Sequence, residues 1–190
     1  MVDLHGAPGS QNGFDNSGRR GKVDNLYFSS PSIIFLKKML SFKVHWLEGD
    51  NVDRTLVILN KLTNLLVSWV ERGLVDQETI YGIALLNEPW GVDQNVWQEV
   101  RDNFYPKGYQ VILERSKSLQ SKMVVLQVVR NATGGLNDWV VVVQQAFRAW
   151  YEFYGYMSEA DGYSNVALDI HSYHAFGPLW NYVASLDNAW

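Results

Sequence analysis

The 190 residues predict an α/β protein built on a parallel sheet, because two patterns alternate along the chain. Short apolar runs have the length of strands, and the longer segments between them repeat apolar residues at helical spacing. Strands that are apolar along nearly their whole length are typical of parallel sheets, which are covered on both faces. We therefore expect four strand-then-helix units.

The first half of the chain supplies two predicted strands and one long helix. Residues 2–4 resemble the end of a strand, and a polar, glycine-rich loop follows over residues 5–21. A helix over residues 51–72 is predicted by apolar residues on one face, capping residues before it and a glycine directly after it. Residues 80–86 form a short apolar run, which predicts a strand buried on both faces.

The second half continues the alternation with less regular spacing. We expect, in order, a helix over 96–104, a helix over 106–117, a strand over 139–143, a helix over 144–156, a strand over 166–170 and a helix over 178–187. Residues 23–43 and 123–137 fit neither pattern. We expect residues 23–43 to be an insertion, from translated non-coding sequence or a misjoined gene model, because removing them would restore a polar loop.

Composition and charge argue against several classes of function. The net charge is −4 and the pI about 5.5, so we expect no nucleic-acid partner, because phosphate groups would be repelled. There is no cysteine, which excludes disulfides, thiolate metal ligands and a cysteine nucleophile. No apolar run approaches the roughly 18 residues of a membrane span, so we expect no membrane association. The first residues also lack the pattern of a signal peptide.

Three groups of polar side chains follow predicted strands, at the edge of the sheet where loops begin. His5 follows the first strand, Asn87 and Glu88 follow the second, and His171 with Tyr173 follows the fourth. Functional groups of parallel β/α folds gather at the carboxyl ends of the strands. A single histidine near a strand is more often a structural residue, but three groups at matching strand ends predict one shared pocket.

Glu88 is the predicted proton donor of this pocket. A carboxyl group directly after an apolar strand is partly desolvated, and desolvation favours its protonated form. Its proton can be given to the departing oxygen of a glycosidic bond. Asn87 can bond a sugar hydroxyl, and Pro89 restricts the backbone beside both side chains. A glutamate that only caps the next helix is the less favoured role, because Glu88 directly follows an apolar strand.

Two other kinds of site find little support in the sequence. Residues 6–13 are rich in glycine, but they lack the Gly-Lys-Ser/Thr ending of a P-loop and the glycine spacing of a dinucleotide site. His171 and His174 are three residues apart, and no predicted helix would present them together to a metal ion. We therefore expect neither a metal nor a cofactor.

Three stretches carry motifs that have counterparts elsewhere. They are residues 5–18 (HGAPGSQNGFDNSG), residues 82–89 (GIALLNEP) and residues 169–176 (DIHSYHAF). In this order they resemble the third-, fourth- and sixth-strand motifs of fungal-type exo-β-1,3-glucanases, which belong to glycoside hydrolase family 5. The first two motifs are specific, and the resemblance covers nearly the whole chain apart from residues 23–43 and 123–137.

The resemblance implies a (β/α)8 TIM barrel that is incomplete here, with about strands three to six and their helices. It implies a glycosidase of the glucan exo-1,3-β-glucosidase type, which retains the anomeric configuration and uses Glu88 as acid/base. The partner would be a β-glucan oligo- or polysaccharide, in the extracellular space or the cell wall. The residues implied to bind sugar are His5, Phe14, Asp15, Asn16, Asn87, His171, Tyr173 and Phe176, of which Phe14 and Phe176 would form an aromatic clamp.

The chain departs from the family pattern in two respects. Retention needs a second carboxylate about 5 Å from the acid, and the family's Gly-Glu-Trp setting for this nucleophile is not found in the sequence. Glu152 and Glu159 lie in or just after a predicted helix and do not replace it. The family's His-Asp-Ala-Phe reads Gln-Gln-Ala-Phe at residues 144–147, which argues against a role for the two glutamines. We expect residues 1–190 to form a partial hydrolase barrel that shows no hydrolysis by itself.

Two function classes and two chemical details stay open at this point. The alternative to an enzyme is a non-catalytic β-glucan-binding remnant that keeps the aromatic clamp. The sequence also does not decide whether the linkage is β-1,3, β-1,6 or β-1,4. Hydrolysis and transglycosylation are equally compatible with it.

Overall fold

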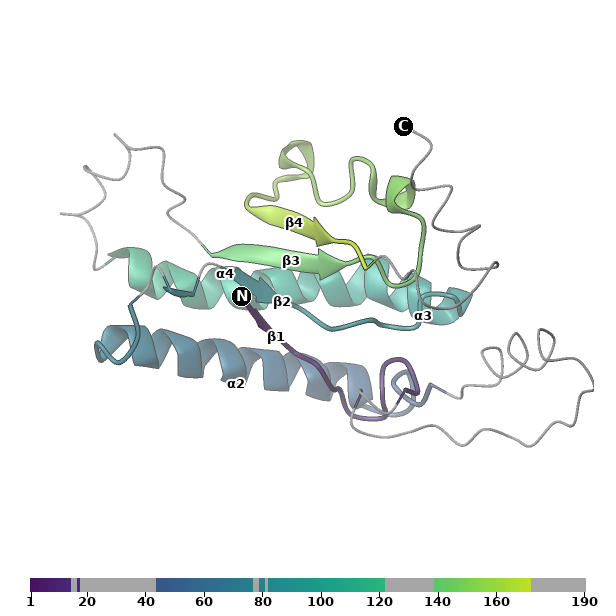
Figure 1. The fold of residues 1–190 in the computed structure, drawn as a ribbon, viewed down its shortest axis with the longest axis horizontal. Coiled ribbons are helices and arrows are strands. Elements are labelled where there is room, and N and C mark those ends of the chain that lie inside the picture. The colour runs from purple at the N-terminus through teal and green to yellow at the C-terminus, as the bar shows by residue number, and fades with distance from the viewer. Residues whose placement is uncertain (15–16, 18–43, 77–78, 81, 122–138, 172–190) are drawn as a thin grey trace, which may run out of the picture.

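The structure is a computed structural model that describes residues 1–14, 17, 44–76, 79–80, 82–121 and 139–171 (Figure 1). Within these residues, four strands form one sheet in chain order, and each neighbouring pair is parallel. The strands are β1 (Val2–Asp3), β2 (Gly82–Ala84), β3 (Val140–Gln144) and β4 (Val166–Asp169). The α/β class with a parallel sheet, predicted from the sequence, is therefore confirmed.

The register of the sheet brings the carboxyl ends of its strands to one edge. Ile83 of β2 is the Cα partner of Val141 of β3, and Val141 is the partner of Val166 of β4. At the end of the ladder, Gln144 of β3 lies opposite Asp169 of β4. The residues that follow β2, β3 and β4 are consequently neighbours in space although they are far apart in sequence.

Helix α2 (Asn51–Glu71) lies between β1 and β2 in the chain, within one residue of the helix predicted over 51–72. Its inner face buries Leu59 and Leu66 in the core. Gly73 ends the helix with a φ of +67°, a left-handed conformation that glycine adopts at little cost. The backbone N–H of Leu74 donates to Trp69 O at 2.9 Å and closes the last turn.

The two helices predicted between the second and third strands form one continuous helical run. It consists of α3 (Gln94–Glu99), a π-helical turn (Val100–Phe104) and α4 (Tyr105–Ser121). Asp93 caps the run, because its side chain accepts the N–H groups of Asn95 and Val96. No helix of the described part of the chain is long and apolar enough to cross a membrane.

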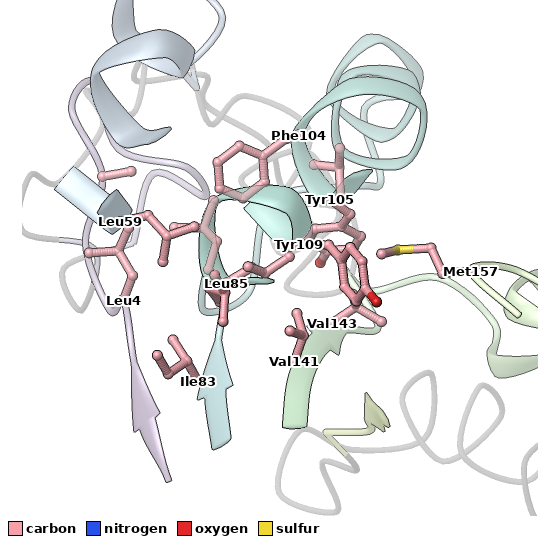
Figure 2. Packing of buried hydrophobic residues seen from close by; sticks show 14 of the residues in the cluster. Leu4, Leu59, Ile83, Leu85, Phe104, Tyr105, Tyr109, Val141, Val143 and Met157 are labelled. Carbon is pink, nitrogen blue, oxygen red and sulfur yellow. The ribbon is translucent and has the colours of Figure 1, made fainter. Parts of the chain in front are cut away.

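The core lies between the sheet and the helices α2 and α4, which pack against each other (Figure 1). Alternate residues of the strands point into it, among them Ile83, Val141 and Val143. Figure 2 shows these side chains in one cluster with Phe104 and Tyr109 of the helical layer. Burial of this apolar face fixes the register of the strands, because a slip of one residue would turn it away from the helices.

The prediction of a helix over residues 144–156 is wrong. Gln144 still belongs to β3, and the chain then turns, because Ala146 and Phe147 adopt φ values of +55° and +56° that no right-handed helix accommodates. The segment contains only one short 3-10 helix, Trp150–Phe153. The helix predicted over 178–187 and the stretches 23–43 and 123–137 lie outside the described residues.

Candidate active site at the carboxyl edge of the sheet

The loop after β2 places Glu88 at the carboxyl edge of the sheet. Beyond the ladder, the N–H of Asn87 donates to the carbonyl oxygen of Leu4 at 2.9 Å, so this loop stays attached to the end of β1. Glu88 is 5% exposed and has a φ of +45°. A left-handed backbone at a residue other than glycine, asparagine or aspartate is strained, and such strain is typical of functional sites.

The carboxyl group of Glu88 is directed at a histidine from the end of β4. Glu88 Oε1 lies 2.8 Å from Nδ1 of His171, and the other ring nitrogen lies 3.1 Å from Oδ2 of Asp169. One imidazole therefore connects two carboxyl groups. The Glu88 side chain is 7% exposed, whereas those of His171 and Asp169 are about one-third exposed. The buried carboxyl group thus has access to a partner that can carry a proton.

Gln144, at the end of β3, contacts both members of this pair. Its Oε1 accepts the backbone N–H of Glu88 at 2.8 Å, and its Nε2 lies 3.0 and 2.8 Å from the two ring nitrogens of His171. The side chain is buried. No role was expected for this residue from its sequence, but the structure places it between the predicted acid and the predicted histidine.

Tyr105, at the start of α4, fixes the backbone of Gln144. Its hydroxyl group donates to Gln144 O at 2.7 Å and accepts the Gln144 N–H at 3.2 Å. Burial raises the pKa of the Tyr105 phenol far above its ordinary value, so the group stays protonated and remains a donor. The helical layer is thereby connected to the site through one buried hydrogen-bonded pair.

Gln11 plays a comparable part on the side of β1. Its side chain is fully buried and bonds three backbone groups: Nε2 donates to His5 O and to Asn87 O, both at 2.9 Å, and Oε1 accepts the Ala7 N–H at 3.0 Å. Its own carbonyl oxygen accepts the Trp90 N–H at 2.9 Å. The loops after β1 and β2 are therefore held together by one glutamine.

Three aromatic rings meet beside the site. Phe14, Trp90 and Phe147 pack edge to face. The ring centroids are 5.6 Å apart for Phe14 and Trp90, 6.1 Å for Phe14 and Phe147, and 5.2 Å for Trp90 and Phe147. They come from the loops after β1, β2 and β3. Phe14 was expected to form a clamp with Phe176, which lies outside the described residues, so the clamp stays a prediction. Trp90 and Phe147 were not among the predicted residues, and no pattern in the sequence distinguishes them from core aromatics.

The structure brings some of the predicted site residues together and separates one from the rest. Asn87, Glu88 and His171 lie at one place, with Asn87 buried. The His5 ring is exposed, and its Nδ1 bonds Asp3 Oδ2 at 2.8 Å. His5 reaches this network through its carbonyl oxygen, which accepts from Gln11. Four predicted residues lie outside the described part: Asp15, Asn16, Tyr173 and Phe176.

A pocket lies apart from these residues. A pocket of about 480 Å³ opens between the loop after β1 and the start of α2. It is lined by Pro8, Gly9, His45, Glu48, Asn51 and Arg54. None of these residues belongs to the network around Glu88. Among the side chains that the structure describes, no group of three His, Asp or Glu residues is arranged to hold a metal ion.

The chemistry available at this edge is the transfer of single protons. A buried carboxyl group hydrogen-bonded to an imidazole can give up a proton and take it back, as general acid/base catalysis requires. Trp90 is buried, and the partly exposed rings of Phe14 and Phe147 beside it offer a surface on which the apolar side of a sugar can pack.

Several known proteins are similar in sequence to most of this chain. No protein-family model matches the chain. It is similar to "Glucan 1,3-beta-glucosidase" of Yarrowia lipolytica, with 29% identity over 177 residues, and to the protein of the same name from Schwanniomyces occidentalis, with 33% over 177 residues. It is also 30% identical over 175 residues to "Glucan 1,3-beta-glucosidase I/II" of Saccharomyces cerevisiae. These alignments cover 92–93% of this chain and 29–31% of each relative, so the chain spans less than a third of their length.

Proposed function

We propose that this chain contains the acid/base residue of a glycosidase that cleaves the β-glucosidic bonds of glucan. The proposed substrate is β-1,3-glucan. The observation that carries the proposal is the buried carboxyl group of Glu88, 2.8 Å from the ring of His171 at the carboxyl edge of a parallel sheet. The names of the similar proteins support the choice of substrate. A family 5 type of (β/α)8 barrel, active outside the cell or at the cell wall, is part of the same proposal.

In the first step, the O–H of Glu88 gives its proton to the glycosidic oxygen as the C1–O bond breaks. A second carboxylate forms a bond to C1 from the opposite face and leaves a covalent glycosyl-enzyme. Glu88, now ionised, then takes a proton from water, whose oxygen bonds C1 and releases the carboxylate. Replacing water by a sugar hydroxyl in this last step would give transglycosylation.

We propose that no acidic residue described near the site acts as this second carboxylate. Asp169 Oδ2 is engaged by the ring of His171, and Glu152 Oε2 lies 2.7 Å from a guanidinium nitrogen of Arg148. A nucleophile about 5 Å from Glu88 is needed for retention. We therefore expect the 190-residue chain to release no glucose from β-1,3-glucan by itself.

Binding of glucan without catalysis is the second candidate function. The partly exposed rings of Phe14 and Phe147 favour it, because aromatic packing on a sugar face needs no acid. Under this alternative the buried pair of Glu88 and His171 would only stabilise the loops. Both candidates predict that Glu88→Gln preserves binding, and they differ in whether this substitution slows cleavage when an external nucleophile is supplied.

Titration with β-1,3-linked glucose oligosaccharides, followed by calorimetry and by sugar release, tests the proposal. We expect binding that Glu88→Gln preserves, and no sugar release by the unmodified chain. Sugar release that Glu88→Gln abolishes would show that the chain has its own nucleophile. The absence of binding to β-1,3-, β-1,4- and β-1,6-linked oligosaccharides alike would contradict both candidates.

A further inference from the structure

The segment that follows β3 places three aromatic side chains at the surface. Tyr151 is 62% exposed and Tyr154 is 87% exposed, and among the described residues these are the most exposed of the large apolar and aromatic side chains. Trp150 is half-buried beside them, and its ring centroid lies 6.2 Å from that of Tyr151. We call these three residues the aromatic platform.

The backbone turns both tyrosines of the platform to the same side. Residues Trp150–Phe153 form a 3-10 helix, and the N–H of Tyr154 donates to Tyr151 O at 3.2 Å, the bond that closes a 3-10 turn. In this geometry side chains three residues apart eclipse each other, about 6 Å apart along the axis. Tyr151 and Tyr154 therefore leave the chain in one row.

The inner side of the same segment is anchored to the helical layer. Phe153 is buried and packs edge to face on Trp97 of α3, with centroids 5.2 Å apart. Arg148 bonds Glu152 at 2.7 Å, and its guanidinium carbon lies 5.4 Å from the centre of the Trp97 ring. Because the segment is held from inside, little ordering would be needed when a ligand binds the platform.

The residue types of the platform suit a ligand that is apolar on its faces and polar at its rim. Tyrosine offers a large, rigid ring with a polar end that can stay in water. The pyranose ring of β-glucose has C–H groups on both faces and hydroxyl groups around its edge. The charged side chains of the segment, Arg148 and Glu152, pair with each other, which fits a neutral ligand.

A second exposed apolar surface differs from the platform in composition. The outer side of α2 exposes Ile58, Leu65 and Trp69, of which two are aliphatic. Aliphatic side chains offer neither a flat ring nor a hydroxyl group to a sugar. This surface therefore supplies a matched control, an exposed aromatic residue that we expect to bind no sugar.

We infer that Trp150, Tyr151 and Tyr154 form a surface site on which a glucan chain packs, in addition to the site at Glu88. The inference rests on glucan as the proposed substrate and is independent of the acid role of Glu88. No bond is made or broken at the platform. Its effect would be to hold the polysaccharide close to the carboxyl edge of the sheet and so raise its local concentration there.

Titration of the 190-residue chain with laminaritriose, the β-1,3-linked trisaccharide of glucose, tests the inference by ¹H–¹⁵N NMR. The indole N–H of Trp150 reports on the platform, and the backbone N–H of Glu88 reports on the other site. We expect the Trp150 signal to shift. In the double variant Tyr151→Ala/Tyr154→Ala, the Kd obtained from this signal should rise at least about tenfold, while that obtained from Glu88 stays within about twofold.

Two controls separate stacking from other effects. The double variant Tyr151→Phe/Tyr154→Phe keeps both rings, so the Kd obtained from Trp150 should stay within about threefold of the unmodified value. Trp69→Ala should leave it unchanged. An unchanged Kd in the double alanine variant, or no shift of the Trp150 signal in the unmodified chain, would overturn the inference. A shift of Trp150 without one of Glu88 would contradict sugar binding at Glu88 and leave the platform supported.

Discussion

Gln144 accepts the backbone N–H of Glu88 at 2.8 Å, so the end of β3 holds the strained residue that follows β2. The same side chain reaches His171 from the end of β4. The parallel register makes this possible, because Gln144 and Asp169 lie opposite each other where the ladder ends. Position in the sheet, rather than proximity in sequence, assembles this group of residues.

The backbone strain at Glu88 can be measured by comparing two substitutions. Glu88→Gly and Glu88→Ala both remove the carboxyl group, but only glycine adopts a φ of +45° without a steric cost. The left-handed conformation costs other residues about 1–2 kcal/mol. We expect the glycine variant to be more stable than the alanine variant by about 1 kcal/mol in urea unfolding. Equal stability of the two variants would mean that the left-handed conformation is not maintained in solution.

Removal of the Tyr105 hydroxyl group tests the connection between α4 and the site. Tyr105→Phe deletes the donor to Gln144 O and the acceptor of the Gln144 N–H. Buried backbone groups that lose a partner cost about 1–3 kcal/mol. We expect a loss of this size in the free energy of unfolding. Tyr151→Phe is the control, since Tyr151 is 62% exposed, and it should change stability by less than about 0.5 kcal/mol.

Stability should fall at alkaline pH. Burial raises the pKa values of Tyr105 and Tyr156 in the folded chain above the ordinary value of 10.0. The unfolded chain therefore releases protons above about pH 10 that the folded chain retains, and the free energy of unfolding decreases as the pH rises further. Unfolding in urea at pH 8–11 measures this. Tyr105→Phe should flatten the decrease, and an unchanged pH profile in that variant would contradict the assignment.

The core between sheet and helices makes a separate prediction. Ile83 is fully buried in β2, so Ile83→Ala should destabilise the fold by about 2–5 kcal/mol. Val57 lies on the outer face of α2 and is 52% exposed, so Val57→Ala should change stability by less than about 0.5 kcal/mol. Thermal unfolding of the two variants gives the comparison. Similar losses would mean that the outer face of α2 is covered in solution.

Periodicity predicted the sheet and the first helix because each depends on a local pattern. The apolar runs before Glu88 and His171 form β2 and β4 in the structure. The helix predicted over 51–72 ends within one residue of the observed end of α2. The helix predicted over 144–156 failed because Ala146 and Phe147 have left-handed backbones. Neither residue type signals such a conformation.

Part of the site could also be predicted from a local pattern. Glu88 and His171 follow apolar strands, so their proximity could be inferred. In the structure, Glu88 Oε1 lies 2.8 Å from His171 Nδ1. The two glutamines that bond the peptide group between Asn87 and Glu88 could not be found this way, because a glutamine in a loop or at a strand end carries no sign of burial. Gln11 bonds backbone groups up to 76 residues away, a distance that no sequence pattern reports.

Cleavage of two glucosides in the presence of azide tests the central claim most directly. Azide can take the place of a nucleophilic carboxylate: its terminal nitrogen bonds C1 from the face opposite the leaving group, and Glu88 protonates the departing oxygen. Laminaribiose, the β-1,3-linked disaccharide of glucose, needs this proton, whereas 2,4-dinitrophenyl β-glucoside has a leaving group that needs none. General acid catalysis contributes about 10²–10⁴-fold.

We expect the unmodified chain to form α-glucosyl azide from both substrates. Glu88→Gln should slow the reaction of laminaribiose at least about 100-fold and leave that of the dinitrophenyl glucoside nearly unchanged. Equal rates with laminaribiose for the unmodified chain and Glu88→Gln, or no α-glucosyl azide from either substrate, would contradict the assignment of Glu88 as proton donor.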